Sequence, residues 1–154
     1  FADASFDIVW QPYSINFVPD VRPVFAGAAR VVRPGGWYVV QCHNPYNQAV
    51  DDASWTPEHG YALKWPYRDG EIDPAVFETA NWIVEQADGS QVEVEGPREF
   101  RHTLRTFLNS LIGSGFNVRR FSEHLTAEEN PEPGTWEHYK WVAPPYLTFW
   151  TVRG

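Results

Sequence analysis

The sequence predicts an α/β fold that forms part of a doubly wound parallel sheet, and three consecutive segments carry this prediction. Residues 6–10 are a short apolar run that fits a buried parallel strand. Residues 21–32 repeat apolar side chains at intervals of three and four, as in a helix with one buried face. Residues 37–42 are apolar at nearly every position, which indicates a second strand covered on both faces. Strand, helix and strand in this order are typical of α/β sheets.

The ends of the first helix are marked by residues with known effects on helices. Asp20 is a favourable N-cap, and Pro23 is tolerated in the first turn. The Pro-Gly-Gly run at residues 34–36 ends the helix, because proline and glycine do not continue one. Before this helix, residues 14–18 are long enough for a single helical turn.

The middle of the chain breaks this pattern and predicts an insertion at about residues 43–96. Residues 43–80 show no sustained periodicity, so we expect an inserted cap or lid there. Residues 82–95 contain two strand-like runs around Asp88-Gly89, a turn signal of β-hairpins. Val and Glu alternate in the second run, so one face of the hairpin should be exposed to water.

The last third of the chain returns to long periodic elements. Pro97 is expected to open the longest helix, and residues 113–115 are expected to end it as a glycine-rich C-cap rather than a phosphate loop. Residues 116–121 predict a third parallel strand, residues 126–135 a polar loop and residues 146–152 a final strand. The expected buried stripe of the helix consists of Phe100, Leu104, Phe107, Leu108, Leu111 and Ile112.

Length and charge limit the classes of function. A chain of 154 residues is about one domain. Its net charge of −8 argues against nucleic-acid backbone binding, which needs an excess of Lys and Arg. No apolar run reaches the roughly 18 residues of a membrane span, so no membrane partner is expected. A local basic cluster is interpreted as a solvated helix face; it consists of Arg98, Arg101, Arg105, Arg119 and Arg120.

Cysteine and aromatic content add two further expectations. Cys42 is the only cysteine, so no internal disulfide can form and a reducing, cytoplasmic location is the default. Aromatic residues make up 16% of the chain, which fits an aromatic-lined cavity, a partner surface or simply a ring-rich core. The five histidines have no metal-ligand spacing, so no metal site is expected.

Three motifs and the order of the elements resemble the C-terminal half of class I S-adenosylmethionine (SAM)-dependent methyltransferases. The motifs are Phe-Ala-Asp-Ala-Ser-Phe-Asp-Ile-Val at residues 1–9, Val-Val-Arg-Pro-Gly-Gly at 31–36 and Ser-Gly-Phe at 114–116. The resemblance implies strands four to seven of a partial Rossmann-like sheet, with the last strand antiparallel and inserted beside the fifth. Residues 1–154 would then be the C-terminal part of one methyltransferase domain, interrupted by the inserted cap and hairpin.

The resemblance implies transfer of a methyl group from SAM to a small-molecule acceptor by direct displacement, within a longer chain. The glycine-rich SAM-binding turn of the family is not in this sequence, so the isolated chain is expected to be inactive. The first strand would then be an exposed apolar edge. The alternative is a non-catalytic fragment or an interaction module that needs an N-terminal half. A nicotinamide dehydrogenase is disfavoured by the ordered motifs. The oligomeric state is left open.

The resemblance also places the cofactor. Ligands of open α/β sheets lie beyond the carboxyl ends of the strands. The turn formed by Gln11, Pro12 and Tyr13 is therefore expected to face SAM. Asn16 and Phe17, in the short helix that follows, are expected to flank its sulfonium or adenine. The alternative is that Tyr13 and Phe17 only pack this helix onto the sheet.

Residues after the second strand are expected to meet the methyl acceptor. His43 is a candidate general base, since imidazole titrates near neutral pH, or else a hydrogen-bonded loop histidine. Asn44 and Tyr46 are candidate substrate contacts. Cys42 is not expected to act as a nucleophile, because direct displacement needs no covalent intermediate.

Two further groups are candidates for the acceptor site. Arg101 and His102, expected at the start of the long helix, are candidates for contact with an anionic acceptor, with His102 as a possible catalytic residue. The alternative is a solvated helix start. An aromatic lid could cover a planar acceptor or shield the methyl donor; its candidates are Trp55, Trp65, Tyr67 and Trp82.

Overall fold

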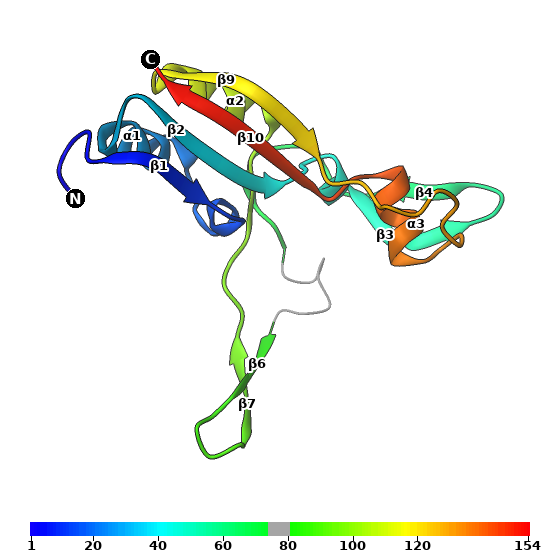
Figure 1. Cartoon of the computed structure of the whole chain (residues 1–154). Coiled ribbons are helices and arrows are strands. Elements are labelled where there is room, and N and C mark those ends of the chain that lie inside the picture. Colours follow the sequence, from blue (N-terminus) through cyan, green and yellow to red (C-terminus); the bar gives the residue numbers. More distant parts are fainter. Residues whose placement is uncertain (74–80) are drawn as a thin grey trace.

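The computed structural model describes residues 1–73 and 81–154, and its centre is a mixed four-stranded sheet (Figure 1). In spatial order the strands are β1 (Phe6–Gln11), β2 (Val32–His43), β10 (Tyr146–Arg153) and β9 (Phe116–Glu123). β1 and β2 are parallel, whereas β10 is antiparallel to both of its neighbours. The predicted α/β sheet, with an antiparallel last strand inserted beside the strand of residues 37–42, is confirmed.

Two helices cover one face of this sheet and create the core. α1 (Val21–Val31) and α2 (Leu104–Gly113) both lie behind the strands in Figure 1. The rings of Phe25 and Phe107 join them, with centroids 5.0 Å apart. Phe107 also packs on Phe149 of β10 at 5.0 Å. Asp20 caps α1 as predicted, because its side chain accepts from the backbone N–H of Arg22.

The opposite face and the β1 edge are more open than the apolar pattern suggested. Ile8 and Trp10 of β1 are 62% and 59% exposed, and β1 ends the sheet. The expectation of an exposed apolar edge is confirmed, and that of a buried first strand is wrong for this chain. Trp37 is also exposed, so β2 is not covered on both faces along its whole length.

The helix expected from Pro97 begins seven residues later. Thr103 is its N-cap, and its side chain accepts from the N–H of Thr106. The preceding β8 (Phe100–Arg101) is extended, because it pairs with β5 (Gly70–Glu71). Phe100 is therefore not part of the helix. Ile112 also does not belong to the buried stripe, since it is 61% exposed. The Gly-rich end is confirmed as a C-cap, with Gly115 at φ 86°.

The insertion contains more regular structure than its sequence indicated. Besides the short helix η2 (Asn47–Ala49), a hairpin forms from β3 (Val50–Thr56) and β4 (Gly60–Leu63). It packs against α3 (Trp136–Val142), a helix that the sequence analysis did not predict. Residues 74–80 of the expected insertion lie outside the described residues.

The second hairpin is formed as predicted by β6 (Asn81–Glu85) and β7 (Gln91–Glu95). It projects from the sheet in Figure 1, and all ten of its strand residues are exposed. The face that was expected to be exposed to water is exposed, and the opposite face is exposed as well. Within the described part of the chain, no helix has the length and apolar character needed to cross a membrane.

Candidate functional site

The parallel strands β1 and β2 end side by side, and this brings Tyr13 and His43 together. Gln11 is the last residue of β1 and lies opposite Val40. The chain then turns through η1 (Ser14–Phe17), which places the Tyr13 hydroxyl 3.1 Å from His43 Nδ1. Two residues predicted from different segments of the sequence thus meet at the carboxyl edge of the sheet.

Further polar groups extend this contact in both directions. The Tyr13 hydroxyl lies 2.9 Å from Glu99 Oε2. On the other side, His43 Nε2 lies 2.7 Å from Asn47 Oδ1. Asn47 Nδ2 in turn donates to the carbonyl of Ala143 at 2.7 Å. The result is a chain of side chains from Glu99 to Asn47, with Tyr13 and His43 in its middle.

Burial shifts the titration of the members of this chain. Burial, more than any other effect, lowers the pKa of His43 to about 4, and the positive charge of Arg101 lowers it too. Burial followed by the nearby Glu99 carboxylate raises the pKa of Tyr13 above its ordinary value. Burial also raises the pKa of Glu99, against the hydrogen bond from Tyr13. His43 is thus held neutral at physiological pH, and Tyr13 keeps its hydrogen.

Aromatic rings surround Tyr13. Its ring centroid lies 5.6 Å from that of Phe17 and 5.7 Å from that of Tyr146. His43 stacks at a tilt on Tyr146 at 5.6 Å. Tyr13 thus packs on Phe17 of the short helix and on Tyr146 of β10, and the role of Tyr13 and Phe17 toward a cofactor stays a prediction.

The other predicted cofactor residues differ in accessibility. Asn16 is 2% exposed, and its Oδ1 accepts from the backbone N–H of His43 at 3.0 Å. Gln11 accepts a hydrogen bond from the Tyr38 hydroxyl. Pro12 is exposed. Asn16 therefore positions the start of the loop after β2. Direct contact of Asn16, Gln11 or Pro12 with a ligand stays a prediction.

The predicted acceptor residues Asn44 and Tyr46 line a cavity of about 400 Å³ beyond the end of β2. Asn44 is 8% exposed and donates to the carbonyl of Pro144 at 2.8 Å, so its amide holds two chain segments together. Tyr46 is 58% exposed and stacks on Tyr67 with centroids 4.6 Å apart. The cavity wall is mainly apolar and also includes Asn47.

Arg101 differs from its expected place on a solvated helix start. It belongs to β8 and is 5% exposed. Its guanidinium donates to the backbone carbonyls of Pro66 and Gln48. Burial and then the charge of Arg68 lower its pKa. The interpretation of Arg101 as part of a solvated basic face is therefore wrong, because backbone carbonyls inside the insertion take its hydrogen bonds.

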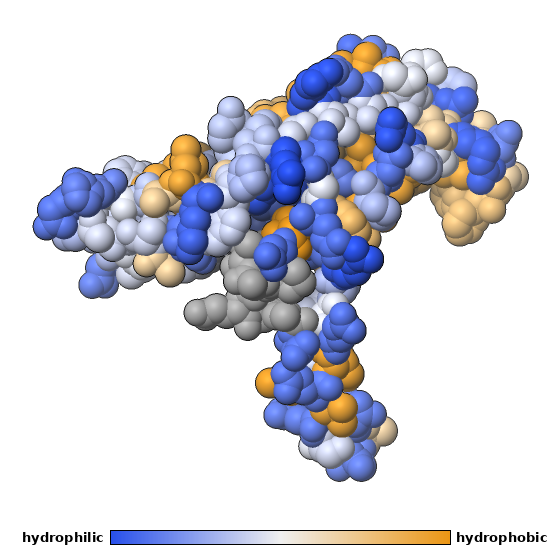
Figure 2. All heavy atoms as spheres, turned by 180° about the vertical axis from the view of Figure 1, so that it is seen from behind, coloured by the Kyte–Doolittle hydropathy of each residue, from blue (hydrophilic) through white to orange (hydrophobic). Residues whose placement is uncertain are grey.

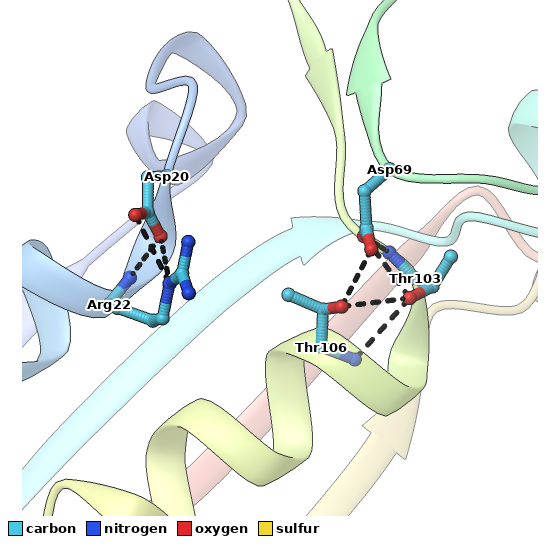
Figure 3. Close-up of polar contacts among 5 residues, drawn as sticks. All are labelled: Asp20, Arg22, Asp69, Thr103 and Thr106. Atoms are coloured by element: carbon cyan, nitrogen blue, oxygen red, sulfur yellow. Dashed lines mark hydrogen bonds and ion pairs between the residues drawn. The ribbon is translucent and has the colours of Figure 1, made fainter.

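His102 lies on the wall of a second cavity, of about 390 Å³, between the N-termini of α1 and α2. Figure 3 shows two capping clusters in this region, Asp20 with Arg22 and Asp69 with Thr103 and Thr106. His102 is 7% exposed, and burial lowers its pKa. No contact joins it to the Tyr13 network among the described residues, so the structure does not bring the two predicted histidines together.

The predicted aromatic lid residues also lie in separate places. Trp55 packs on Tyr61 and on His138 of α3, with centroids 5.1 and 4.4 Å apart. Tyr67 packs on Tyr46 instead. Trp82 is half-exposed on the β6–β7 hairpin. Ring contacts within the described ranges therefore do not unite these residues into one lid.

Two members of the network, Glu99 and Asn47, were missed by sequence reasoning. Glu99 was assigned to a helix that in fact begins after it. Asn47 follows His43 by four residues, and this spacing across a short helical turn was the one available signal.

Neither a metal site nor a reactive thiol stands out beside this network. Within residues 1–73 and 81–154, no three His, Cys, Asp or Glu side chains are grouped so that they could hold a metal ion. The Cys42 thiol is 4% exposed, and burial raises its pKa. A buried protonated thiol is a poor nucleophile.

Comparisons with known proteins match this chain, in sequence over its first part and in fold over nearly all of it, to methyltransferases. A family model described as "Methyltransferase domain" matches residues 1–40. The 27-O-demethylrifamycin SV methyltransferase of Amycolatopsis mediterranei (strain S699) is 53% identical over 36 residues, which are 23% of this chain and 13% of that protein. The segment matched by the family model contains β1, η1, α1 and the start of β2.

Solved structures match over nearly the whole chain. A SAM-dependent methyltransferase from Mesorhizobium loti superposes with a TM-score of 0.70 and 18% identity, over 99% of this chain and 64% of that one. A SAM-dependent methyltransferase from Clostridium acetobutylicum ATCC 824 superposes with a TM-score of 0.60 and 12% identity, over 100% of this chain and 61% of that one. The chain thus spans less than two thirds of the length of these structures. With its inserted antiparallel β10, it has the fold of the class I SAM-dependent methyltransferases.

Proposed function

We propose that this chain is the C-terminal part of one methyltransferase domain, with an insertion at about residues 43–96, and that the domain transfers a methyl group from SAM to a small-molecule acceptor. One observation carries the proposal: the strand order β1-β2-β10-β9, with its antiparallel β10, occurs together with the methyltransferase match of residues 1–40. SAM, when bound, supplies the methyl group on a positively charged sulfur.

The cofactor would contact the turn after β1. The rings of Tyr13 and Phe17 lie together there, and Tyr13 is only partly buried. Aromatic faces attract cations, so these residues fit a sulfonium group. Gln11, Pro12 and Asn16 belong to the same proposed site. The role of this segment is to orient the donor and exclude water, and positioning of this kind can supply about 7–11 kcal/mol of a reaction barrier.

The acceptor would lie beyond β2, beside the cavity lined by Asn44 and Tyr46. Its volume of about 400 Å³ suits a small organic molecule. The curated relative is named for an O-demethylated rifamycin, which favours a small-molecule acceptor over a macromolecule. The net charge of −8 supports the same choice, because it disfavours a nucleic-acid partner. Trp55, Arg101 and His102 are not among the residues that line this cavity and are not part of the proposal.

A second candidate function is a non-catalytic module that acts only with a separate N-terminal half. The exposed apolar edge of β1 favours it, since an unpaired edge strand is a template for another strand. A start codon directly before Phe1 in the coding DNA would support the module. An in-frame segment that encodes a strand followed by Gly-x-Gly-x-Gly would support the enzyme.

Isothermal titration with SAM and S-adenosylhomocysteine tests the proposal. We expect the 154-residue chain to bind either compound weakly or not at all, because the glycine-rich turn is not in it. The chain extended by in-frame upstream sequence should bind with micromolar affinity and consume SAM in a screen against a metabolite panel. An extended protein that carries the turn but binds neither compound contradicts the enzyme proposal. Micromolar binding by the 154 residues alone shows that the turn is unnecessary.

A further inference from the structure

The Tyr13 hydroxyl lies between two hydrogen-bond acceptors but has a single hydrogen to offer. Glu99 Oε2 is 2.9 Å from it on one side, and His43 Nδ1 is 3.1 Å from it on the other. An ionised carboxylate only accepts, whereas a neutral imidazole has one donor and one acceptor nitrogen. The state of this contact therefore depends on which imidazole nitrogen carries the hydrogen.

Asn47 decides this question. Its Nδ2 donates to the carbonyl of Ala143 at 2.7 Å, so its Oδ1 is the atom that faces His43 Nε2 at 2.7 Å. An amide oxygen accepts and cannot donate, so Nε2 must carry the hydrogen. The neutral His43 ring consequently presents a lone pair at Nδ1 toward Tyr13.

With Glu99 ionised, the network is one proton short of full hydrogen bonding. Tyr13 can then donate to Glu99 or to His43, and one of the two acceptors lacks a donor. A proton added to Glu99 removes the conflict: the carboxyl group donates to Tyr13, Tyr13 donates to His43 Nδ1, and His43 Nε2 donates to Asn47. An unsatisfied acceptor away from water costs free energy, so the fold favours uptake of this proton.

We propose that Glu99, Tyr13 and His43 act as one proton-accepting unit, suited to take the proton that a hydroxyl or amine acceptor loses when it is methylated. This use of the unit rests on the proposed function. The acceptor oxygen or nitrogen forms a bond to the methyl carbon, and the carbon–sulfur electron pair stays on sulfur. The proton released by the acceptor goes to the Glu99 carboxylate, which then turns its O–H toward Tyr13. This transfer needs the reacting atom at the Glu99 end of the unit, whereas the cavity beyond β2 meets the unit at Asn47. Glu99 Oε1, which has no hydrogen bond in the structure described, is the open end of the unit.

The surrounding charges agree with this placement of the proton. Burial raises the pKa of Glu99 and lowers that of His43 to about 4, so the added proton resides on the carboxyl group. Arg101 acts in the same direction, since its charge disfavours a charged imidazole. The other titratable groups beside Tyr13 are Tyr146 and Cys42, and burial raises the pKa of Cys42, which keeps the thiol neutral.

Nuclear magnetic resonance titration of the 154-residue chain tests the unit without any cofactor. The ¹⁵N shifts of the His43 ring and the ¹³C shift of the Glu99 carboxyl are followed as a function of pH. We expect Nε2 to be protonated throughout, and the Nδ1 shift to change at the same midpoint as the Glu99 carboxyl. A hydrogen on Nδ1 of the neutral ring, or an Nδ1 shift that ignores the Glu99 midpoint, overturns the proposal.

Three variants test whether the Tyr13 hydroxyl couples Glu99 to His43 Nδ1. Tyr13→Phe keeps the ring and removes the hydroxyl, so the Nδ1 shift should no longer follow Glu99. Tyr146→Phe removes the hydroxyl of the neighbouring ring and should leave the shared midpoint in place. Glu99→Gln places an NH₂ donor beside Tyr13, which mimics the proton-loaded state. Above the pKa of His43, which is about 4, its Nδ1 shift should stay at the value that the wild type shows with Glu99 protonated and the ring neutral. This variant decides the matter if Tyr13→Phe does not fold.

The proposed function and this proposal fail in different experiments. If the extended chain does not bind SAM, the proposed methyltransferase function is contradicted. The common titration midpoint of His43 Nδ1 and the Glu99 carboxyl is not affected by that result. If His43 Nδ1 and the Glu99 carboxyl change at independent midpoints, the proton-accepting unit is contradicted, but SAM binding is not. In the metabolite screen, hydroxyl or primary and secondary amine acceptors support the use of the unit. Methylation confined to thioethers or tertiary amines, which have no proton to lose, overturns it.

Discussion

The four-stranded sheet and the β6–β7 hairpin are both regular β structure, but different forces stabilise them. Beneath the sheet, residues from β2, β9 and β10 join α1 and α2 in a continuous buried cluster. The hairpin has no buried residue in either strand. Its local backbone bonds and its Asp88-Gly89 turn define it, and all ten of its strand residues lie on the surface. A sequence pattern can thus predict a hairpin without indicating what covers it.

The apolar side chains of the hairpin make this difference visible. They lie on the surface of the projecting arm (Figure 2), and five of them are 37–70% exposed: Trp82, Ile83, Val84, Val92 and Val94. A two-stranded hairpin on its own is marginally stable in water. The stability of the chain should therefore reside in the sheet, and mutations in the two regions can test this.

Truncation of Phe107 should give the largest loss of stability. Its side chain is 1% exposed and contacts the rings of Phe25 and Phe149. Phe107→Ala should lower the free energy of unfolding by about 3–5 kcal/mol in denaturant titration. The matched control is Ile112→Ala in the same helix, where the side chain is 61% exposed, and a loss near 0.5 kcal/mol or less is expected. Equal losses would contradict the assignment of the core to this helix face.

A methyl group at Gly36 should have the next largest effect. A Cβ there would lie 2.9 Å from the carbonyl oxygens of Arg33 and Asp7, so backbone must move. We expect Gly36→Ala to cost about 1–3 kcal/mol, the usual range for overpacking. Gly27→Ala in α1 is the control, because nothing lies within 4 Å of its added methyl group. That variant should gain up to about 1 kcal/mol from helix propensity. Thermal unfolding of both proteins measures the contrast.

Asp69 connects the insertion to α2 and should give an intermediate effect. It accepts from the N–H of Thr103 at 2.7 Å and from the hydroxyl of Thr106 at 2.7 Å. Asp69→Ala should cost about 1 kcal/mol, as loss of a helix cap does. Burial raises the pKa of Asp69, but these hydrogen bonds outweigh burial and lower it overall.

The lowered pKa of Asp69 fixes the sign of its pH dependence. The unfolded chain binds a proton near pH 3.9, and the folded chain binds it only at a lower pH. The contribution of Asp69 is therefore complete above about pH 5 and is lost as the pH falls through the folded value. The stability gap between wild type and Asp69→Ala should be constant from pH 5 to 7 and should narrow below pH 4. A gap that widens in acid contradicts the hydrogen bonds described here.

Elements governed by local pattern were predictable from the sequence. The cap at Asp20, the β6–β7 turn and the antiparallel final strand all followed from residue types and from the family resemblance. The start of α2 did not, because β5 pairs with residues 100–101, which lie about 30 positions later in the sequence. Periodicity cannot report a partner strand that lies so far away in the chain.

The candidate site was predictable only in part, for the same reason. Gln11 to Tyr13 and His43 could be placed at one sheet edge because parallel strands end together. Glu99 comes from the far side of the insertion, and only the tertiary structure brings it to Tyr13. Arg101 was misplaced because its partners are backbone carbonyls, which leave no signature in the sequence.

The smallest effect should come from Trp82 on the hairpin. A buried tryptophan usually costs about 3–5 kcal/mol when truncated. Trp82 is 50% exposed and faces Val94 across the hairpin. Trp82→Ala should therefore change the free energy of global unfolding by less than about 0.5 kcal/mol. Hydrogen exchange of the β6 and β7 amides should already be fast in the wild type, because they open without the sheet. A loss of several kcal/mol, or slow exchange at these amides, would mean that the hairpin shares the core of the sheet, and the two regions would then unfold as one unit.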